Sequence, residues 1–516
     1  MDFLGTHLVS LGKRMQRFIP TSKPLRLTAV ALAISVGLSG CASIDKNLGT
    51  SSSATACAAG GVAGAVIGAG LAAALGKSVG GGAAAGAALG CGATMLYQTR
   101  VKRLQDVARQ EGLAMQVREL QVSTPAARGS SAQVATVGIE AQLQVGEMFP
   151  VGSAQITVEG QQKVRKIAMA LADNQKSQKA NAARKILVVG HTDSTGSAET
   201  NQRLSEQRAQ AMGHILVSAG IAASDIYYQG AGSSRPLADN TTEAGRTENR
   251  RVEMIEVDSQ QLLIERVRTE RNNPKYLAQG TRASTDSRSK TQSKPSVNAT
   301  AKADEPPAQS GEPKTTAKDV ITLESSGFID FGGDPATGTK SVLAQSIKPK
   351  SSGFGFISPA YASAPISACV ADMPRLTGEV KNLATNTPLP IIATNDYLPG
   401  MNGRPWGGVL NGNVALVGPV SILKEEARVI QQPFMQFITD YKTANSKETA
   451  KFQAVANTYE GEDKILYRVF AAEPGKAPVA CMDIVFDKRA GTAVAGELFY
   501  PKQGQAYVTA FQPTRR

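Results

Sequence analysis

Gly190-His191-Thr192-Asp193-Ser194-Thr195-Gly196 is the stretch of sequence that decides the fold. It follows Ile186–Gly190, a short apolar run with the length of a buried strand, and it precedes Glu199–Ala219, where apolar residues recur with helical spacing. Small and polar residues between a strand and a helix predict a turn. We therefore expect Asp193 to emerge just beyond the end of a strand, with a long helix following it.

The elements on either side extend this strand, turn and helix into a larger unit. Alternating apolar residues predict a strand before it, helical spacing predicts a further helix, and two later apolar runs predict strands. The order β-α-β-α-β predicts a compact α/β sandwich over residues 130–258. The additional elements are Val137–Val145, Val158–Leu171, Ile226–Tyr228 and Arg251–Val257.

Two more motifs lie within this unit. Residues 149–154 have the sequence FPVGSA, and residues 249–253, NRRVE, lead into the last strand. These motifs resemble the C-terminal domain of the OmpA/MotB family when they are taken together with residues 190–196. Three residues of the predicted helix belong to the same resemblance: Asn201, Leu204 and Arg208. Residues 149–154 are most similar to the flagellar-stator form of that domain. The resemblance covers about a quarter of the chain.

The resemblance implies peptidoglycan binding through the diaminopimelate of the stem peptide. It assigns Asp193 and Arg208 as the binding pair, and it places four further residues at the site: Thr192, Asn201, Leu204 and Arg250. The residue types suit this ligand, which ends in an ammonium and a carboxylate on one carbon. An aspartate can pair with the ammonium, and a guanidinium can hold the carboxylate with two parallel hydrogen bonds.

Spacing along the helix supports the same site. Asn201, Leu204 and Arg208 share one helix face by their i, i+3, i+7 positions. The alternative is that Asp193 and Arg208 pair only with each other.

Two positions depart from the family pattern, because Thr200 stands where relatives often have tyrosine and Thr195 where peptidoglycan-associated lipoproteins often have arginine. We expect His191 to be structural.

The N-terminus has the features of a lipoprotein signal peptide over residues 1–40. Basic residues precede an uncharged apolar stretch, residues 27–38, which is too short to remain as a membrane span. The stretch ends in Leu38-Ser39-Gly40-Cys41, which resembles a lipobox and implies lipidation of Cys41. The alternative is an ordinary secretory signal, and translation could begin at Met15. With Ala42 next, the resemblance implies the outer membrane, on its periplasmic face.

Residues 54–97 are rich in alanine and glycine, with glycines at every fourth position in two runs. On a helix, such glycines form a flat stripe that lets helices approach closely. This glycine-zipper segment, followed by the α/β unit, resembles YiaD-type lipoproteins. We expect a helical hairpin at the outer membrane that could also form homo-oligomers, and the alternative is a flexible spacer.

Two regions follow the α/β unit. Residues 268–318 have the composition of a disordered linker. Residues 366–516 are expected to form an α+β domain, with a helix over Val420–Tyr441 that Pro433 should kink, and with a hairpin of Ile465–Ala471 and Val479–Phe486. Cys369 and Cys481 would form a disulfide in the oxidising periplasm, and the alternative is two buried thiols.

The sequence argues against an enzyme. Its three histidines all lie before residue 215, so the C-terminal region has no Ser-His or Cys-His pair and no histidine metal site, and we expect no catalytic residue, metal or cofactor. The alternative is a hydrolase that uses carboxylates alone. The net charge of +13 is not arranged as an aromatic-interleaved stripe, so we expect no nucleic-acid binding.

Two functions remain. One is a tether between the outer membrane and the wall. The other is an accessory component of an envelope-spanning secretion or conjugation machine, with residues 366–516 as the module that binds a protein partner.

Overall fold

The computed structural model describes residues 97–123, 134–172, 184–271, 273, 276, 328–337, 341–348, 355–356, 366–391, 394–473 and 475–516. The predicted signal peptide, Cys41, nearly all of the glycine-zipper segment and most of the predicted linker lie outside these residues. Within them, no helix combines the length and the apolar character needed to cross a membrane.

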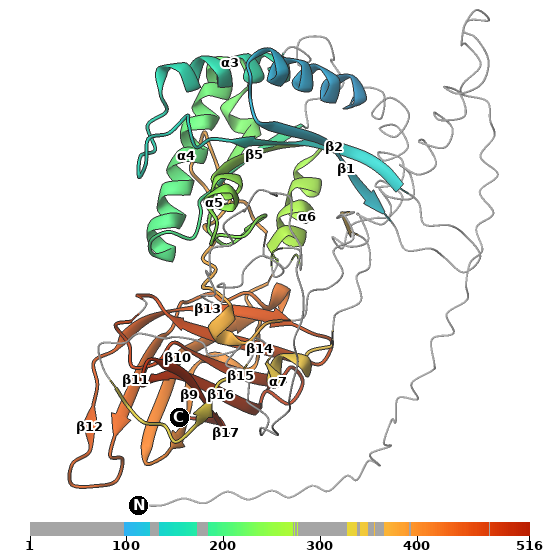
Figure 1. Cartoon of the computed structure of the whole chain (residues 1–516). Helices are drawn as coiled ribbons and strands as arrows, with labels where there is room; N and C mark the ends of the chain where they lie inside the picture. Colours follow the sequence, from blue (N-terminus) through green and yellow to red (C-terminus); the bar gives the residue numbers. More distant parts are fainter. Residues whose placement is uncertain are drawn as a thin grey trace, which may run out of the picture. The chain divides into compact units, whose positions relative to one another are not determined.

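The first body is built on a seven-stranded mixed sheet (Figure 1). Strand β5 runs antiparallel to both of its neighbours, β2 and β3, whereas β3 runs parallel to its other neighbour, β4. The strands in spatial order are β7 (Gly355–Phe356), β1 (Met115–Ser123), β2 (Val134–Gln144), β5 (Arg251–Val257), β3 (Lys185–His191), β4 (Ile226–Gly232) and β8 (Lys381–Asn382).

Helices cover both faces of this sheet. On one face, α3 (Val158–Ala172), α4 (Ala198–Ser218) and helical residues 97–110 enclose an apolar core. On the other, α6 (Gln260–Arg271) packs over a second apolar cluster. Ala209, Met212 and Leu216 of α4 are fully buried, as the helical spacing predicts. The β-α-β-α-β order predicted from the sequence is confirmed, and β1, β7, β8 and α6 extend it.

Three features position the turn after β3. Gly190 lies where an added Cβ would be 2.0 Å from the Ser205 carbonyl oxygen, so only glycine lets α4 approach β3 this closely. Gly196 has a φ of +91°, which glycine adopts without strain. Ser197 then caps α4, because its side chain accepts a hydrogen bond from the Thr200 amide. The sequence therefore fixes both the strand end and the helix start.

The second body is an eleven-stranded antiparallel sheet. Its meander runs from β9 to β17, and the short strand β18, which follows β17, pairs with β9 and so brings the chain back to the start of the sheet. We call this the rolled sheet. Its strands are β9 (Tyr397–Leu410), β10 (Asn413–Leu423), β11 (Phe434–Thr439), β12 (Lys447–Glu448), β13 (Phe452–Glu460), β14 (Lys464–Ala471), β15 (Cys481–Asp487), β16 (Ala493–Lys502), β17 (Gln505–Phe511), β18 (Thr514–Arg515) and β6 (Asp334–Pro335).

The rolled sheet corrects the predicted α+β class of residues 366–516. The helix predicted over Val420–Tyr441 is wrong, because this region holds the end of β10 and all of β11. β10 is buried along nearly its whole length between β9 and β11. A strand packed on both faces gives a near-continuous apolar run that its periodicity does not distinguish from a buried helix. The predicted β14–β15 hairpin is confirmed.

Domain boundaries also differ from those predicted. α6 continues to Arg271, and Tyr276 beyond it is buried, so ordered structure extends into the region predicted as linker. Phe331 lies in the core of the rolled sheet although it precedes the predicted boundary at residue 366. Residues 376–391 contribute β8 to the first sheet instead of the second. Cys369 and Cys481 form a disulfide, with an S–S distance of 2.11 Å.

Candidate functional site

The site lies where three elements meet: the carboxyl end of β3, the start of α4, and the approach to β5 through α5 (Glu243–Asn249). Asp193 stands in the turn after β3. Its Oδ1 accepts a hydrogen bond from the Thr195 amide at 2.9 Å, and its Oδ2 accepts one from Arg250 Nη1 at 2.8 Å. The carboxylate is therefore held from two sides.

Arg250 is the residue that the structure pairs with Asp193. Its Nη2 also donates to Glu243 Oε1 and to Thr247 Oγ1, each at 2.8 Å. Burial lowers the pKa of Arg250, but the hydrogen bonds to Asp193 and Glu243 together raise it by more than burial lowers it. The net shift of the pKa is therefore upward. Arg250 is thus a permanent cation beside Asp193. The sequence motif included Arg250 in the site without indicating this ion pair.

Arg208 is buried and faces the same turn from α4. Its Nε donates to the Ser153 carbonyl at 2.9 Å, and its guanidinium carbon lies 5.2 Å from the centre of the Phe149 ring. Within the described part of the chain, no carboxylate lies within ion-pair distance of Arg208. Burial lowers its pKa, Asp193 opposes that shift, and Arg250 adds to it.

The geometry does not support an exclusive pair of Asp193 and Arg208. Asp193 is bound to Arg250, and Arg208 is oriented by Phe149 and Ser153. Both orienting residues belong to the motif at residues 149–154, so that motif was a signal for their position. One face of the Arg208 guanidinium packs on the ring, and within the described residues no hydrogen bond reaches its two terminal nitrogens.

The remaining predicted site residues hold the loop. Asn201 donates from Nδ2 to the Thr195 carbonyl at 2.9 Å. Thr192 is buried, and its amide donates to the Gly232 carbonyl at 3.0 Å. Leu204 is half-buried on α4. The structure thus gives Asn201 and Thr192 a supporting position, while Asp193, Arg208 and Arg250 present the charged groups.

A chain of amides extends this support to α5. Asn249 accepts hydrogen bonds from the Leu237 and Ala238 amides at 2.7 and 3.1 Å, and it donates to Asn240 Oδ1 at 2.9 Å. Asn240 Oδ1 in turn accepts a hydrogen bond from the Ser194 amide at 3.1 Å. Because Ser194 follows Asp193, this chain ties the acidic turn to the start of β5.

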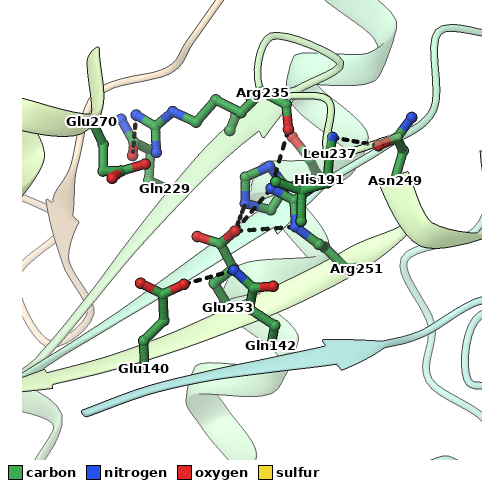
Figure 2. Close-up of polar contacts among 12 residues, drawn as sticks. Glu140, Gln142, His191, Gln229, Arg235, Leu237, Asn249, Arg251, Glu253 and Glu270 are labelled. Carbon is green, nitrogen blue, oxygen red and sulfur yellow. Dashed lines mark hydrogen bonds and ion pairs between the residues drawn. The ribbon is translucent and has the colours of Figure 1, made fainter. Parts of the chain in front are cut away.

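Directly behind the site, on the α6 side of the sheet, lies a buried polar network (Figure 2). Arg251 donates to Glu253 Oε1 from Nε at 3.0 Å and from Nη2 at 2.8 Å. His191 Nε2 lies 3.5 Å from the same oxygen and makes no hydrogen bond of good geometry. Burial, followed by the charge of Arg251, lowers the pKa of His191 to about 4. A neutral, fully buried histidine fits the structural role expected of it.

The comparisons with known proteins concern this first body. A model of the OmpA family matches residues 148–250. The outer-membrane lipoprotein YfiB of Pseudomonas aeruginosa is 48% identical over 71 residues, which cover 14% of this chain and 42% of YfiB. The probable lipoprotein YiaD of Escherichia coli is 38% identical over 106 residues, which cover 20% of this chain and 45% of YiaD.

Among solved structures, the cell wall anchor of the type VI secretion system (T6SS) from Pseudomonas aeruginosa is 25% identical, with a TM-score of 0.23. The match covers 31% of this chain and 96% of that one. The chain spans less than half the length of the curated relatives named above. Residues 148–250 match the OmpA family, and the rolled sheet lies outside that match.

Proposed function

We propose that this chain holds peptidoglycan non-covalently, with the diaminopimelate end of the stem peptide bound between Asp193 and Arg208. The observation that carries the proposal is the guanidinium of Arg208. It is buried and fixed through Nε, and no hydrogen bond within the described residues reaches its terminal nitrogens. A carboxylate is the group that the open side of such a fork binds best.

Asp193 supplies the opposite charge. Each of its oxygens accepts one hydrogen bond from the chain and keeps a further lone pair for the ligand. The ammonium of diaminopimelate would bind there, beside the carboxylate held by Arg208. Arg250 keeps Asp193 in place through the hydrogen bond from its Nη1. The site therefore matches a group that carries both charges on one carbon.

The test is co-sedimentation of the mature full-length chain with purified sacculi. Variants Asp193→Ala and Arg208→Ala are compared with Arg203→Ala, which removes an exposed arginine from the same helix. The site variants should bind at least about tenfold more weakly, and the control should bind like the parent chain. Parent-like binding by a folded double variant would refute the proposed site.

We further propose that a lipid on Cys41 places the domain at the periplasmic face of the outer membrane, so that the chain tethers that membrane to the wall.

The second folded body favours another role, since a simple tether does not require the rolled sheet. In that role the chain is an accessory component of an envelope-spanning machine, and the rolled sheet binds a protein partner. Cross-linking in intact cells, with and without residues 394–516, tests this alternative.

A further inference from the structure

Residues 376–391, which we call the strap, are part of the first sheet although they follow the start of the rolled sheet in sequence. The strap lies antiparallel along β4, with Tyr227 opposite Asn382 and Tyr228 opposite Lys381. At one end the Gly378 amide donates to the Gly230 carbonyl at 2.8 Å, and at the other the Leu383 amide donates to the Ile226 carbonyl at 2.8 Å. Main-chain hydrogen bonds therefore follow most of the length of β4.

The side chains of the strap enter both cores of the first body. Val380, Leu389 and Ile391 are buried with the apolar cluster on the α6 side of the sheet. Leu383 packs on the opposite side, where its Cδ2 lies 3.1 Å from the position that a Cβ on Gly213 of α4 would take. A segment that merely passed over the surface would not contribute to both cores.

Polar contacts fix the register of the strap. Lys381 Nζ lies 2.8 Å from Glu206 Oε1 on α4, and Asn382 Nδ2 donates to the Ser224 carbonyl at 2.9 Å. Gln229 Nε2 donates to the Gly378 carbonyl at 2.9 Å. The Gly378 amide adds its hydrogen bond to the Gly230 carbonyl at 2.8 Å. These contacts specify one position for the strap on β4.

The residues just before the strap are fixed to the rolled sheet. Cys369 is disulfide-bonded to Cys481 of β15. Arg468 of β14 lies 2.8 Å from Asp372, and it also donates to the Ser367 carbonyl at 2.9 Å. The chain is therefore bound to the rolled sheet up to Asp372, and only a few residues later it is bound to the first body.

We propose that the strap is a docking strand that holds the two bodies together independently of the chain between residues 277 and 327. Addition of a strand to a sheet edge is a recurring mode of peptide recognition, in which main-chain hydrogen bonds give affinity and side-chain pockets give specificity. Here the docking site is formed by β4 and α4, and its ligand is the strap of the same chain. Through it, a load on the rolled sheet reaches the peptidoglycan-binding domain directly.

The test cuts the chain between the two bodies. A protease site is inserted between residues 295 and 296 of the full-length mature chain, which is then cleaved under native conditions. The two halves should co-elute in size-exclusion chromatography. Separation of the halves of the parent chain after cleavage would overturn the proposal.

Charge reversal then tests whether the strap is responsible. Lys381→Glu should weaken association of the halves at least tenfold, because it places two carboxylates together, and Glu206→Lys in the same chain should restore it. Lys447→Glu, at an exposed position of β12, is the matched control. β7 on β1 and the Arg268–Glu425 ion pair also connect the two halves, so Leu383→Asp should weaken their association by more than Lys381→Glu does without abolishing it. If the halves of the Leu383→Asp variant associate as tightly as those of the parent, the strap is not the docking strand.

The proposal can fail independently of peptidoglycan binding. When the cleaved protein is sedimented with sacculi, the C-terminal half should pellet with the N-terminal half, and Leu383→Asp should leave more of the C-terminal half in solution. If the N-terminal half itself does not pellet, the proposed peptidoglycan site is wrong, whereas the chromatography still decides the role of the strap.

Discussion

Arg250 donates a hydrogen bond from Nη1 to Oδ2 of Asp193 at 2.8 Å, although 57 positions separate them in sequence. This pairing joins the turn after β3 to the entry of β5 and leaves Arg208 without a carboxylate partner among the described residues. Two arginines therefore flank Asp193, but Arg250 also pairs with Glu243. The positive charge that remains for a ligand carboxylate is that of Arg208.

Asp193→Asn removes the negative charge of this side chain and keeps nearly the same shape. The amide can still accept the hydrogen bond from the Thr195 main chain, but it no longer attracts an ammonium. Sacculus binding should fall at least about tenfold. Thermal unfolding should change little, because a partly exposed ion pair contributes at most about 1 kcal/mol. Unchanged binding by this variant would mean that the charge of Asp193 is not needed.

The disulfide between Cys369 and Cys481 should contribute strongly to the stability of the rolled sheet. The two cysteines are 112 positions apart, and closure of a loop of about that length constrains the unfolded chain by roughly 4 to 5 kcal/mol. The Cys369→Ser, Cys481→Ser double variant should therefore unfold at a lower denaturant concentration. Thiol labelling of unreduced protein provides the check, since two reactive thiols at these positions would exclude the bond.

The first body was predictable because its signals are local. Alternating and helical periodicities placed the strands and helices that carry Asp193 and Arg208, and the motif at residues 149–154 identified the loop that holds Arg208. The partner of Asp193 was not predictable in the same way. Arg250 reaches it from a distant part of the chain, and its neighbour Arg251 has the same side-chain type but points to the buried face.

The second body was less predictable because its order depends on long-range pairing. β10 is buried along nearly its whole length, so its apolar run gave no clear period of two. In β11 the burial alternates, but its apolar residues Phe434, Met435, Phe437 and Ile438 do not. The strap was missed for a related reason. Lys381 and Asn382 form a strand of only two residues, which has no recognisable pattern until β4 is beside it.

Lipidation at Cys41 should determine where the chain resides. Cys41→Ser should abolish acylation and leave either an uncleaved precursor or a form that is released from membranes. Mass spectrometry of the mature N-terminus measures this directly. An unacylated N-terminus at another residue of the parent chain would contradict the assignment, and membrane fractionation would then show whether another segment retains the protein.

His191 should make folding sensitive to mild acid. Its pKa is about 4 in the fold and 6.5 as an ordinary side chain, so the folded state keeps it neutral where the unfolded chain takes up a proton. The stabilising contribution is complete above pH 6.5 and is lost as the pH falls toward 4, by up to about 3 kcal/mol. His191→Gln should make the free energy of unfolding depend less on pH between 6.5 and 4, as measured by denaturant titrations at each pH. His214→Gln, at an exposed position on α4, should not.

Arg208→Lys tests the fork geometry on which peptidoglycan binding is proposed to depend. Lysine keeps the positive charge, but it can neither hold a carboxylate with two parallel hydrogen bonds nor reproduce the Nε bond to the Ser153 carbonyl. Loss of one partner from a desolvated charged pair costs about 2 to 5 kcal/mol, so binding to sacculi should fall more than tenfold in Arg208→Lys and in Arg208→Ala alike. Circular dichroism and thermal melts are needed alongside, because Arg208 also packs on Phe149. If Arg208→Lys binds like the parent while Arg208→Ala does not, a point charge is sufficient, and the proposed two-bond grip on the ligand carboxylate is wrong.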